Sequence, residues 1–194
     1  YMMHTYPLMQ TVFGKIVMCL NPRHSSLLFL ERIIFKKKHY RQITCISEQC
    51  KKEIVNHYKV SPHTIEIIYN GVNISIFTPK NRTTYRDTVR ATYGIAPDEV
   101  LLLFVGSGFK RKGLKYVIEA LSLINKSQKT KLLVVGKGTI REHQRLARKN
   151  GVLDKLIFAG VCKHIQEIYA GGDIFVLPSE YDAFGTACLE AMAS

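Results

Sequence analysis

The residues of this chain best suited to chemistry stand in a glycine-rich, basic segment, Gly106-Ser-Gly-Phe-Lys-Arg-Lys-Gly113. An apolar run precedes the segment and a predicted helix follows it. Glycines permit close backbone approach, and the free N–H groups of a helix start attract anions together with nearby cations. The segment therefore predicts a cradle for a phosphate or diphosphate, without the spacing of a P-loop or a dinucleotide fingerprint. A tight turn with solvated basic side chains explains the same residues equally well.

Two acidic residues follow in the segment Pro178–Glu190. Asp182 falls in the loop after a predicted strand, and Glu190 falls in the first turns of the next predicted helix. Gly185 interrupts any continuous helix between them, so we expect both carboxylates to face one crevice, one toward a sugar and one toward a ribose. Taken singly, a loop Asp is often a cap and an early helical Glu is often a dipole partner. Glu180-x-Asp182 has no further carboxylate or His nearby in sequence, so we expect no metal site.

Alternating apolar strands and helices predict the scaffold that positions these residues. Continuous apolar strands joined by helices indicate an α/β fold with a parallel sheet that is covered on both faces. We expect strands at 100–105, 131–135, 156–159 and 174–177, and helices at 85–93, 114–126, 139–150, 163–170 and from about 186. Such sheets bind ligands beyond the carboxyl ends of their strands. The loops that should surround the site are 106–113, 136–138, 160–163 and 178–185.

A shorter pattern of the same kind lies upstream. Strands are expected at 43–46 and 65–69 on either side of a helix at 48–58, for which Ser47 is the expected N-cap. An apolar stretch that ends in Lys36-Lys37-Lys38 predicts an amphipathic helix whose basic end is either solvated or directed to an anionic membrane. The irregular stretch 72–82 predicts a linker, with the boundary between domains 1–77 and 78–194 near residue 78.

The composition indicates anionic partners and a reducing compartment. The 194 residues include 28 Lys and Arg and 15 Asp and Glu, which gives a formal net charge of +13. Phosphates, nucleic acid and an acidic membrane all fit this charge, but its even spread along the chain argues against nucleic acid. The five Cys lack metal-ligand spacing. We expect a cytoplasmic protein and, because the chain opens with Tyr1 and closes within a predicted helix, a fragment cut at both ends.

Several motifs together resemble glycosyltransferase family 4, the group 1 glycosyltransferases. In the family's order they are Asn70-Gly71-Val72-Asn73, Phe77-x-Pro79, Lys112-Gly113, Gly136-x-Gly138, Phe158-x-Gly160, Asp173-Ile-Phe-Val-Leu-Pro-Ser179 and the acid-seven-acid segment that ends in Glu190-Ala-Met-Ala. The glycine-rich loop and the region from Pro22 to Lys36 look most like the lipopolysaccharide core glucosyltransferase branch. The resemblance implies a GT-B fold, which has two Rossmann-like domains with parallel sheets, both incomplete in this chain.

The resemblance also implies an enzyme. It would be a retaining transferase that moves a sugar from a nucleotide-diphosphate sugar to a lipid-linked or polysaccharide acceptor, in peripheral contact with the inner face of the cytoplasmic membrane. This fragment alone would be inactive. No metal and no cofactor other than the donor substrate is expected. A non-catalytic nucleotide-sugar binding module and a basic nucleic-acid-binding protein are the alternatives.

Site roles follow from the resemblance position by position. The implied catalytic residues are Lys112 and Arg111, which bind the donor diphosphate, and Asp182, which holds the transferred sugar. Further donor contacts are implied for Gly106, Ser107, Gly108, Lys110, Gly136, Phe184, Gly185, Thr186 and Glu190, the last on the ribose. Two positions depart from the family pattern, since Asp182 stands where a Glu is usual and Ser107 where an Arg is usual.

Overall fold

The computed structural model describes residues 22–36, 40–125 and 127–194. The chain divides into two compact units, Tyr1–Asn70 and Gly71–Ser194. The domain limits expected from the sequence, 1–77 and 78–194, stay a prediction. The predicted basic end at Lys37 and Lys38 lies outside the described residues. No helix within the described ranges has both the length and the apolar character that crossing a bilayer requires.

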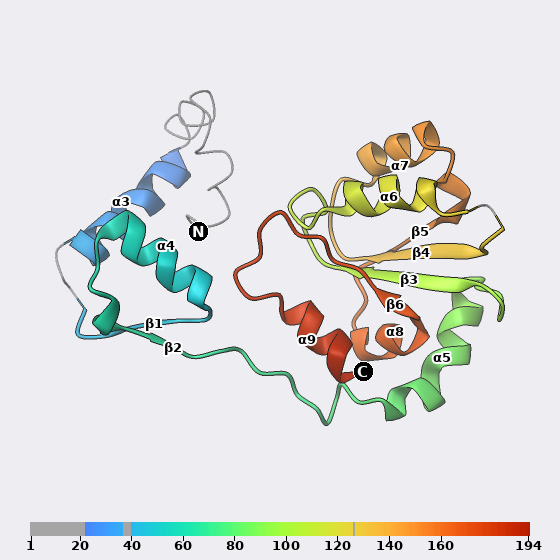
Figure 1. Cartoon of the computed structure of the whole chain (residues 1–194), viewed down its shortest axis with the longest axis horizontal. Coiled ribbons are helices and arrows are strands. Elements are labelled where there is room, and N and C mark those ends of the chain that lie inside the picture. The colour runs from blue at the N-terminus through green and yellow to red at the C-terminus, as the bar shows by residue number, and fades with distance from the viewer. Residues whose placement is uncertain (1–21, 37–39, 126) are drawn as a thin grey trace. The chain divides into compact units, whose positions relative to one another are not determined.

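The first unit contains a small parallel sheet with helices. Its elements are α3 (Pro22–Lys36), β1 (Ile43–Cys45), α4 (Glu48–Tyr58), the 3-10 helix η1 (Pro62–Thr64) and β2 (Ile65–Ile67). The two strands pair in parallel, with Ile43 opposite Ile65 (Figure 1). Ser47 caps α4 as predicted, because its hydroxyl accepts a hydrogen bond from the Cys50 N–H at 3.2 Å.

The second unit is built on a four-stranded parallel sheet with the strand order β5-β4-β3-β6. Along the chain its elements are α5 (Lys80–Thr92), β3 (Val100–Val105), α6 (Leu114–Leu123), β4 (Thr130–Val135), α7 (Ile140–Lys149), η2 (Leu153–Lys155), β5 (Leu156–Gly160), α8 (Ile165–Gly171), β6 (Ile174–Phe175) and α9 (Thr186–Ala193). Strand order steps outward from β3 in both directions, so the carboxyl end of β3 is the point where ligands bind in such sheets.

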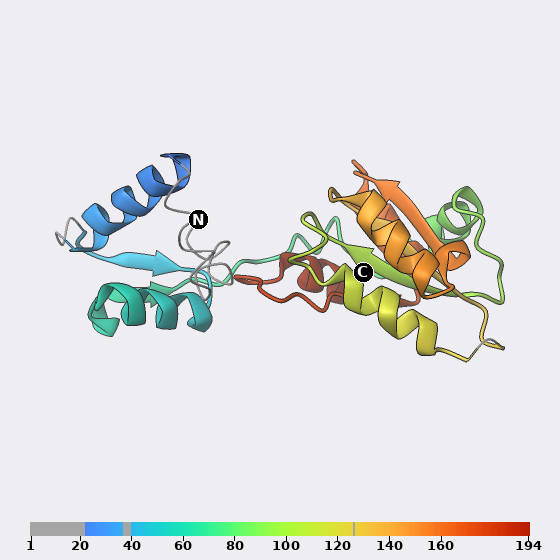
Figure 2. The ribbon, with the colours of Figure 1, turned by 90° about the horizontal axis from the view of Figure 1, so that it is seen from above.

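Helices cover both faces of this sheet, which confirms the predicted α/β architecture. Alternate β3 residues explain the two cores: Leu102 and Phe104 pack against α6 and α7, whereas Leu101 and Leu103 pack against α5 and α8. Figure 1 shows the two helix layers on opposite sides of the strands. Figure 2 shows α6 and α7 side by side over one face. All four of these β3 side chains are at most 9% exposed, so the strand that leads into the glycine-rich loop is held rigidly.

Several element boundaries differ from the expected ones: α6 ends at Leu123 rather than at 126, and β2 ends at Ile67 rather than at 69. Helix α5 begins at Lys80 rather than at Tyr85, so part of the predicted linker is helical. The first turn of this helix is polar, and its residues are held by contacts with the distant Asp173 that no local pattern reveals. Strand β6 spans only Ile174–Phe175, although Val176 still donates a backbone hydrogen bond to the Leu103 carbonyl at 2.9 Å.

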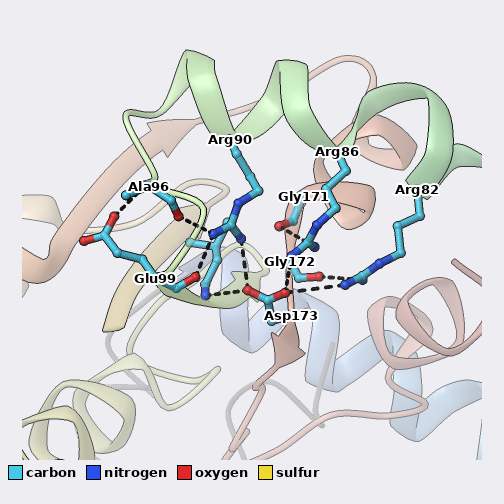
Figure 3. Close-up of polar contacts among 9 residues, drawn as sticks. Arg82, Arg86, Arg90, Ala96, Glu99, Gly171, Gly172 and Asp173 are labelled. Atoms are coloured by element: carbon cyan, nitrogen blue, oxygen red, sulfur yellow. Dashed lines mark hydrogen bonds and ion pairs between the residues drawn. The ribbon is translucent and has the colours of Figure 1, made fainter. Parts of the chain in front are cut away.

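An arginine ladder on α5, defined by Arg82, Arg86 and Arg90, fastens this helix to the sheet (Figure 3). The three arginines recur every four residues, so they share one helix face, and all three reach Asp173. The shortest ion pairs join Arg86 Nη2 to Oδ1 at 2.5 Å and Arg90 Nη1 to Oδ2 at 3.0 Å. Asp173 Oδ2 also accepts the Leu101 N–H at 2.8 Å, which ties the ladder to β3.

The charge of Asp173 is stabilised by these contacts. Burial raises the pKa of its carboxyl, but the Leu101 amide and the Arg86 and Arg90 guanidinium groups lower it by more, so the pKa lies below its ordinary value. Arg90 is 5% exposed and uses its remaining donors on the Ala96 and Glu99 carbonyls, each at 2.6 Å. The ladder is therefore a structural clamp at the amino-terminal edge of the sheet, opposite the candidate site.

Candidate functional site

The glycine-rich loop lies between β3 and α6, as predicted, and a buried aromatic ring anchors it. Phe109 is 2% exposed and packs edge-on against Phe104, with ring centroids 6.1 Å apart. The loop also donates hydrogen bonds to the loop after β4: Gly106 N–H to Val135 O at 2.9 Å and Gly108 N–H to Lys137 O at 2.7 Å. These two amides are thus engaged within the protein, and the cations of the loop are the side chains that follow, Lys110, Arg111 and Lys112.

Glycine is required where the loops after β3 and β4 meet. Gly136 has a φ of +130°, and a Cβ there would lie 2.2 Å from the Gly106 carbonyl oxygen. A Cβ on Gly138 would lie 2.2 Å from the Phe109 ring. The Lys137 amide between them donates to the Ser107 hydroxyl at 3.2 Å. Gly136 and Ser107, both predicted donor contacts, therefore shape the loop pair through backbone packing.

The loop after β6 locks against the glycine-rich loop. The Glu180 N–H donates to the Arg111 carbonyl at 2.9 Å, and Arg111 Nη1 donates to the Tyr181 carbonyl at 2.9 Å. A Cβ on Gly113, whose φ is +76°, would lie only 1.9 Å from the Pro178 carbonyl oxygen. Reciprocal hydrogen bonds and this close approach make the two loops one rigid surface. We call loops 106–113 and 178–185 the paired loops.

Lys112 and Asp182 form an ion pair across the paired loops. Their side chains are 12% and 24% exposed, so the pair is shielded from much of the solvent. Burial raises the pKa of Asp182, but the Lys112 ammonium and the amides of Gly185 and Phe184 lower it by more. The pKa of the carboxyl therefore lies below its ordinary value, and the group stays ionised at neutral pH. The structure thus brings together three predicted groups: the cation, the acid and the glycine turn that starts α9.

Glu190 is held by a different partner. Its Oε2 accepts a hydrogen bond from the Tyr169 hydroxyl at 2.9 Å. The Asp182 carboxylate lies near the Cys188 side of α9, because a Cβ on Gly185 would contact Asp182 Oδ2 at 3.9 Å and Cys188 Sγ at 3.6 Å. Asp182 itself lies in the loop before α9, so the two acids stand on neighbouring segments and have different partners, Lys112 for Asp182 and Tyr169 for Glu190.

The remaining predicted donor residues flank the ion pair. Lys110 is exposed on the glycine-rich loop, and Thr186 is exposed at the first position of α9. Sequence reasoning missed Glu180 as part of the site: it pairs with Lys115 at 3.2 Å and accepts from the Tyr116 hydroxyl at 2.9 Å. The spacing Glu180-x-Asp182 is the signal in the sequence, but such a pattern suggests a metal site rather than a pairing with Lys115.

Both carboxylates of the Glu180-x-Asp182 pattern form ion pairs with lysine side chains. Glu180 pairs with Lys115 and Asp182 pairs with Lys112. Across the described part of the chain, no three His, Cys, Asp or Glu side chains gather as metal ligands.

Tyr169 was also missed. It is a core residue with 6% of its surface exposed. Its hydroxyl bonds the Glu190 carboxylate, a contact that forms only because α8 and α9 come together in space. No pattern in the sequence carries that contact.

Comparisons with known proteins agree with this geometry. The family model for glycosyl transferases group 1 matches residues 85–194, and the model for Glycosyltransferase Family 4 matches residues 3–76. An uncharacterized glycosyltransferase of Methanocaldococcus jannaschii is 31% identical over 156 residues, which are 79% of this chain and 40% of the relative. The lipopolysaccharide glucosyltransferase WaaG of Escherichia coli is 28% identical over 177 residues, or 90% of this chain and 47% of WaaG.

Solved structures match at the level of the fold. A crystal structure of WaaG, a glycosyltransferase involved in lipopolysaccharide biosynthesis, superposes with a TM-score of 0.81 at 28% identity, covering 90% of this chain and 48% of WaaG. Anabaena HepE, crystallised with UDP and glucose, gives a TM-score of 0.75 at 18% identity over 90% of this chain and 48% of HepE. The chain spans less than half the length of these relatives. The match to the group 1 model over residues 85–194, more than half of the 194 residues, together with the parallel α/β sheet of GT-B type, shows that this chain belongs to the group 1 glycosyltransferases.

Proposed function

We propose that this chain supplies the donor site of a glycosyltransferase that moves a sugar from a nucleotide-diphosphate sugar to a lipid-linked or polysaccharide acceptor. The observation that carries the proposal is the Lys112–Asp182 ion pair on the paired loops, at the ligand-binding edge of the sheet. The similarity to WaaG favours a role in lipopolysaccharide core synthesis. The sugar class and the acceptor belong to this proposal.

The charges at the paired loops suit the chemistry of sugar transfer. Cleavage of a sugar–phosphate bond builds positive charge on the sugar and negative charge on the departing diphosphate. Fixed cations beside the diphosphate stabilise that separation more in the transition state than in the ground state. We assign this role to Lys112 and Arg111, whose positions are set by the hydrogen bonds between the two loops. No metal ion is needed for this stabilisation.

Donor binding exchanges partners within the ion pair. A diphosphate that reaches Lys112 competes with the Asp182 carboxylate for the ammonium. Once released, Asp182 is still held by the Phe184 and Gly185 amides, and its free oxygen can accept hydrogen bonds from hydroxyls of the sugar. Donor binding thus prepares Lys112 and Asp182 in one event. In this proposal Asp182, although shorter than the Glu that is usual in the family, still reaches the donor sugar. Glu190, within α9, is assigned to the ribose.

Stereochemistry and location complete the proposal. Retention of anomeric configuration is proposed from the family resemblance, and no described residue is assigned as a covalent nucleophile. The net charge of +13 favours a cytoplasmic protein that touches an anionic membrane surface peripherally. Helix α3 supports such contact, since it exposes Phe29 at 64% and Leu30 at 52% beside basic residues.

Titration calorimetry of the full-length protein with UDP-, GDP- and ADP-glucose tests the proposal. We expect one donor to bind tightly and a Lys112→Ala/Glu190→Ala double variant that remains folded to lose that binding. Absence of binding to all three by folded wild-type protein contradicts the transferase assignment. Binding without any transfer to lipid-linked or polysaccharide acceptors instead favours a non-catalytic nucleotide-sugar module.

A further inference from the structure

The Tyr169 ring is fixed on three sides. It lies on α8 and meets the Phe77 ring edge-on, with centroids 5.9 Å apart and an interplanar angle of 73°. The Phe175 ring of β6 lies against it at 5.9 Å and 50°. Buried aromatic contacts of this kind restrict both side-chain torsions of a tyrosine. The hydroxyl of Tyr169 is therefore delivered to a defined point beside α9.

That hydroxyl holds both the backbone and a side chain of α9. It donates to Glu190 Oε2 at 2.9 Å and lies 3.2 Å from the Ala187 carbonyl oxygen, one helical turn earlier. Burial and the negative charge of Glu190 both raise the pKa of Tyr169 above its ordinary value. The hydroxyl consequently keeps its proton at neutral pH and donates the hydrogen bond to the carboxylate.

This bond selects one orientation of the Glu190 carboxylate. A glutamate on a helix has three rotatable side-chain bonds and loses substantial entropy when a ligand fixes them. Among the residues that the structure describes, Tyr169 is the one donor to the Glu190 carboxylate. The bond occupies Oε2 and leaves Oε1 able to accept from a ligand hydroxyl. A carboxylate that is already oriented in this way binds a ligand with little further loss of side-chain entropy.

We propose that Tyr169 is a positioning residue that sets the Glu190 carboxylate for the ribose hydroxyls of the donor nucleotide. The inference rests on the proposed function, because the bond matters for binding only if Glu190 contacts the ribose. Under this inference Tyr169 controls how well the site separates ribonucleotides from deoxyribonucleotides. A purely structural link between α8 and α9 would affect stability and leave that discrimination unchanged.

The test compares nucleotides that differ by one hydroxyl. Calorimetry first identifies which of UDP, GDP and ADP binds the full-length protein most tightly, and that nucleotide is then compared with its 2′-deoxy and 3′-deoxy forms. Wild type should prefer the ribonucleotide, since a hydroxyl bonded to a carboxylate is lost in one deoxy form. The measured quantity is the affinity for the ribonucleotide divided by the affinity for the deoxy form that binds more weakly. In Tyr169→Phe, which keeps the ring, we expect this ratio to fall about tenfold.

Two further variants separate the explanations. Tyr93→Phe is the matched control: Tyr93 packs against the same core as Tyr169, and its hydroxyl contacts only Cys162 Sγ, at 3.7 Å, among the described residues. It should keep the wild-type ratio. Glu190→Ala should abolish the preference, and Tyr169→Phe should have no further effect in that background. Thermal unfolding of each variant checks that it folds.

Each outcome decides one question. If wild type discriminates, Glu190→Ala does not, and Tyr169→Phe keeps the wild-type ratio, the positioning role is wrong while the ribose assignment stands. If Glu190→Ala keeps the preference, Glu190 does not read the ribose and both assignments are overturned. If wild type binds none of the three nucleotides, the proposed function falls, and the inference falls with it.

Discussion

Replacing Lys112 with alanine perturbs the centre of the proposed phosphate site, and the structure sets the size of the effect. The Lys112 side chain is 12% exposed, so its ammonium acts in a partly shielded environment. A hydrogen bond between charged groups contributes about 1.5–3 kcal/mol, equivalent to about 10- to 150-fold in affinity. The variant also leaves Asp182 uncompensated beside the donor phosphates. We therefore expect the affinity for a nucleotide-diphosphate sugar to fall by about 100-fold.

Calorimetry with UDP-, GDP- and ADP-glucose measures this loss, and transfer by the full-length protein should fall in parallel. Lys129→Ala is the matched control. Lys129 also pairs with an aspartate, since its Nζ lies 2.5 Å from Asp98 Oδ2, but this pair stands before β3 and β4, at the opposite ends of the strands from the site. We expect wild-type affinity for the control and a folded protein in both cases.

A second variant tests the repulsion in this reasoning. In Lys112→Ala/Asp182→Asn the uncompensated carboxylate is gone, so part of the lost affinity should return. No recovery would show that the Asp182 charge does not face the donor phosphates. An affinity of the single variant within about threefold of wild type would refute the phosphate assignment itself.

Three other substitutions give independent checks. Asp182→Asn removes the carboxylate that competes with the donor, so a nucleoside diphosphate without sugar should bind about tenfold more tightly in calorimetry, whereas weaker binding contradicts partner exchange. Gly113→Ala places a Cβ 1.9 Å from the Pro178 carbonyl oxygen and should unfold at clearly lower denaturant concentration than Gly151→Ala, which has the same kind of positive φ but nothing within 4 Å. Asp173 has a lowered pKa, so its contribution to stability is present above about pH 4 and is lost on acidification. Asp173→Asn should cost about 2 kcal/mol at pH 7, and this deficit should shrink toward pH 3 if the ladder acts through charge.

The strands and most helices of the second unit follow from local pattern. The apolar run 100–105 is the buried strand β3 over the same residues, because a strand covered on both faces needs apolar side chains throughout. The start of α5 could not be predicted in this way. Its first turn is polar, and Arg82 in that turn and Arg86 in the next both reach Asp173, which lies 91 and 87 residues later. Long-range ion pairs leave no periodic signal.

Part of the candidate site could also be predicted from the sequence, and part of it could not. The glycine-rich loop and Asp182 could be recognised because their chemistry is written in residue types at a strand end. The partners of the two acids could not be read from the sequence, since Asp182 pairs with Lys112 and Glu190 with Tyr169, and the shared crevice stays a prediction. Seven residues separate the two acids along the chain, but the turn at Gly185, which places Asp182 in a loop and Glu190 within α9, depends on the folded structure.

The paired loops have a consequence for engineering. Because the Pro178 carbonyl rests where Gly113 has no side chain, and Arg111 and Glu180 bond each other's loops, neither loop has an independent shape. If one of the paired loops were replaced by that of a relative, the new loop would not fit the other loop, which had not been replaced. Donor preference in this architecture should therefore be exchanged, in the laboratory or during divergence, by moving residues 106–113 and 178–185 together as a single cassette.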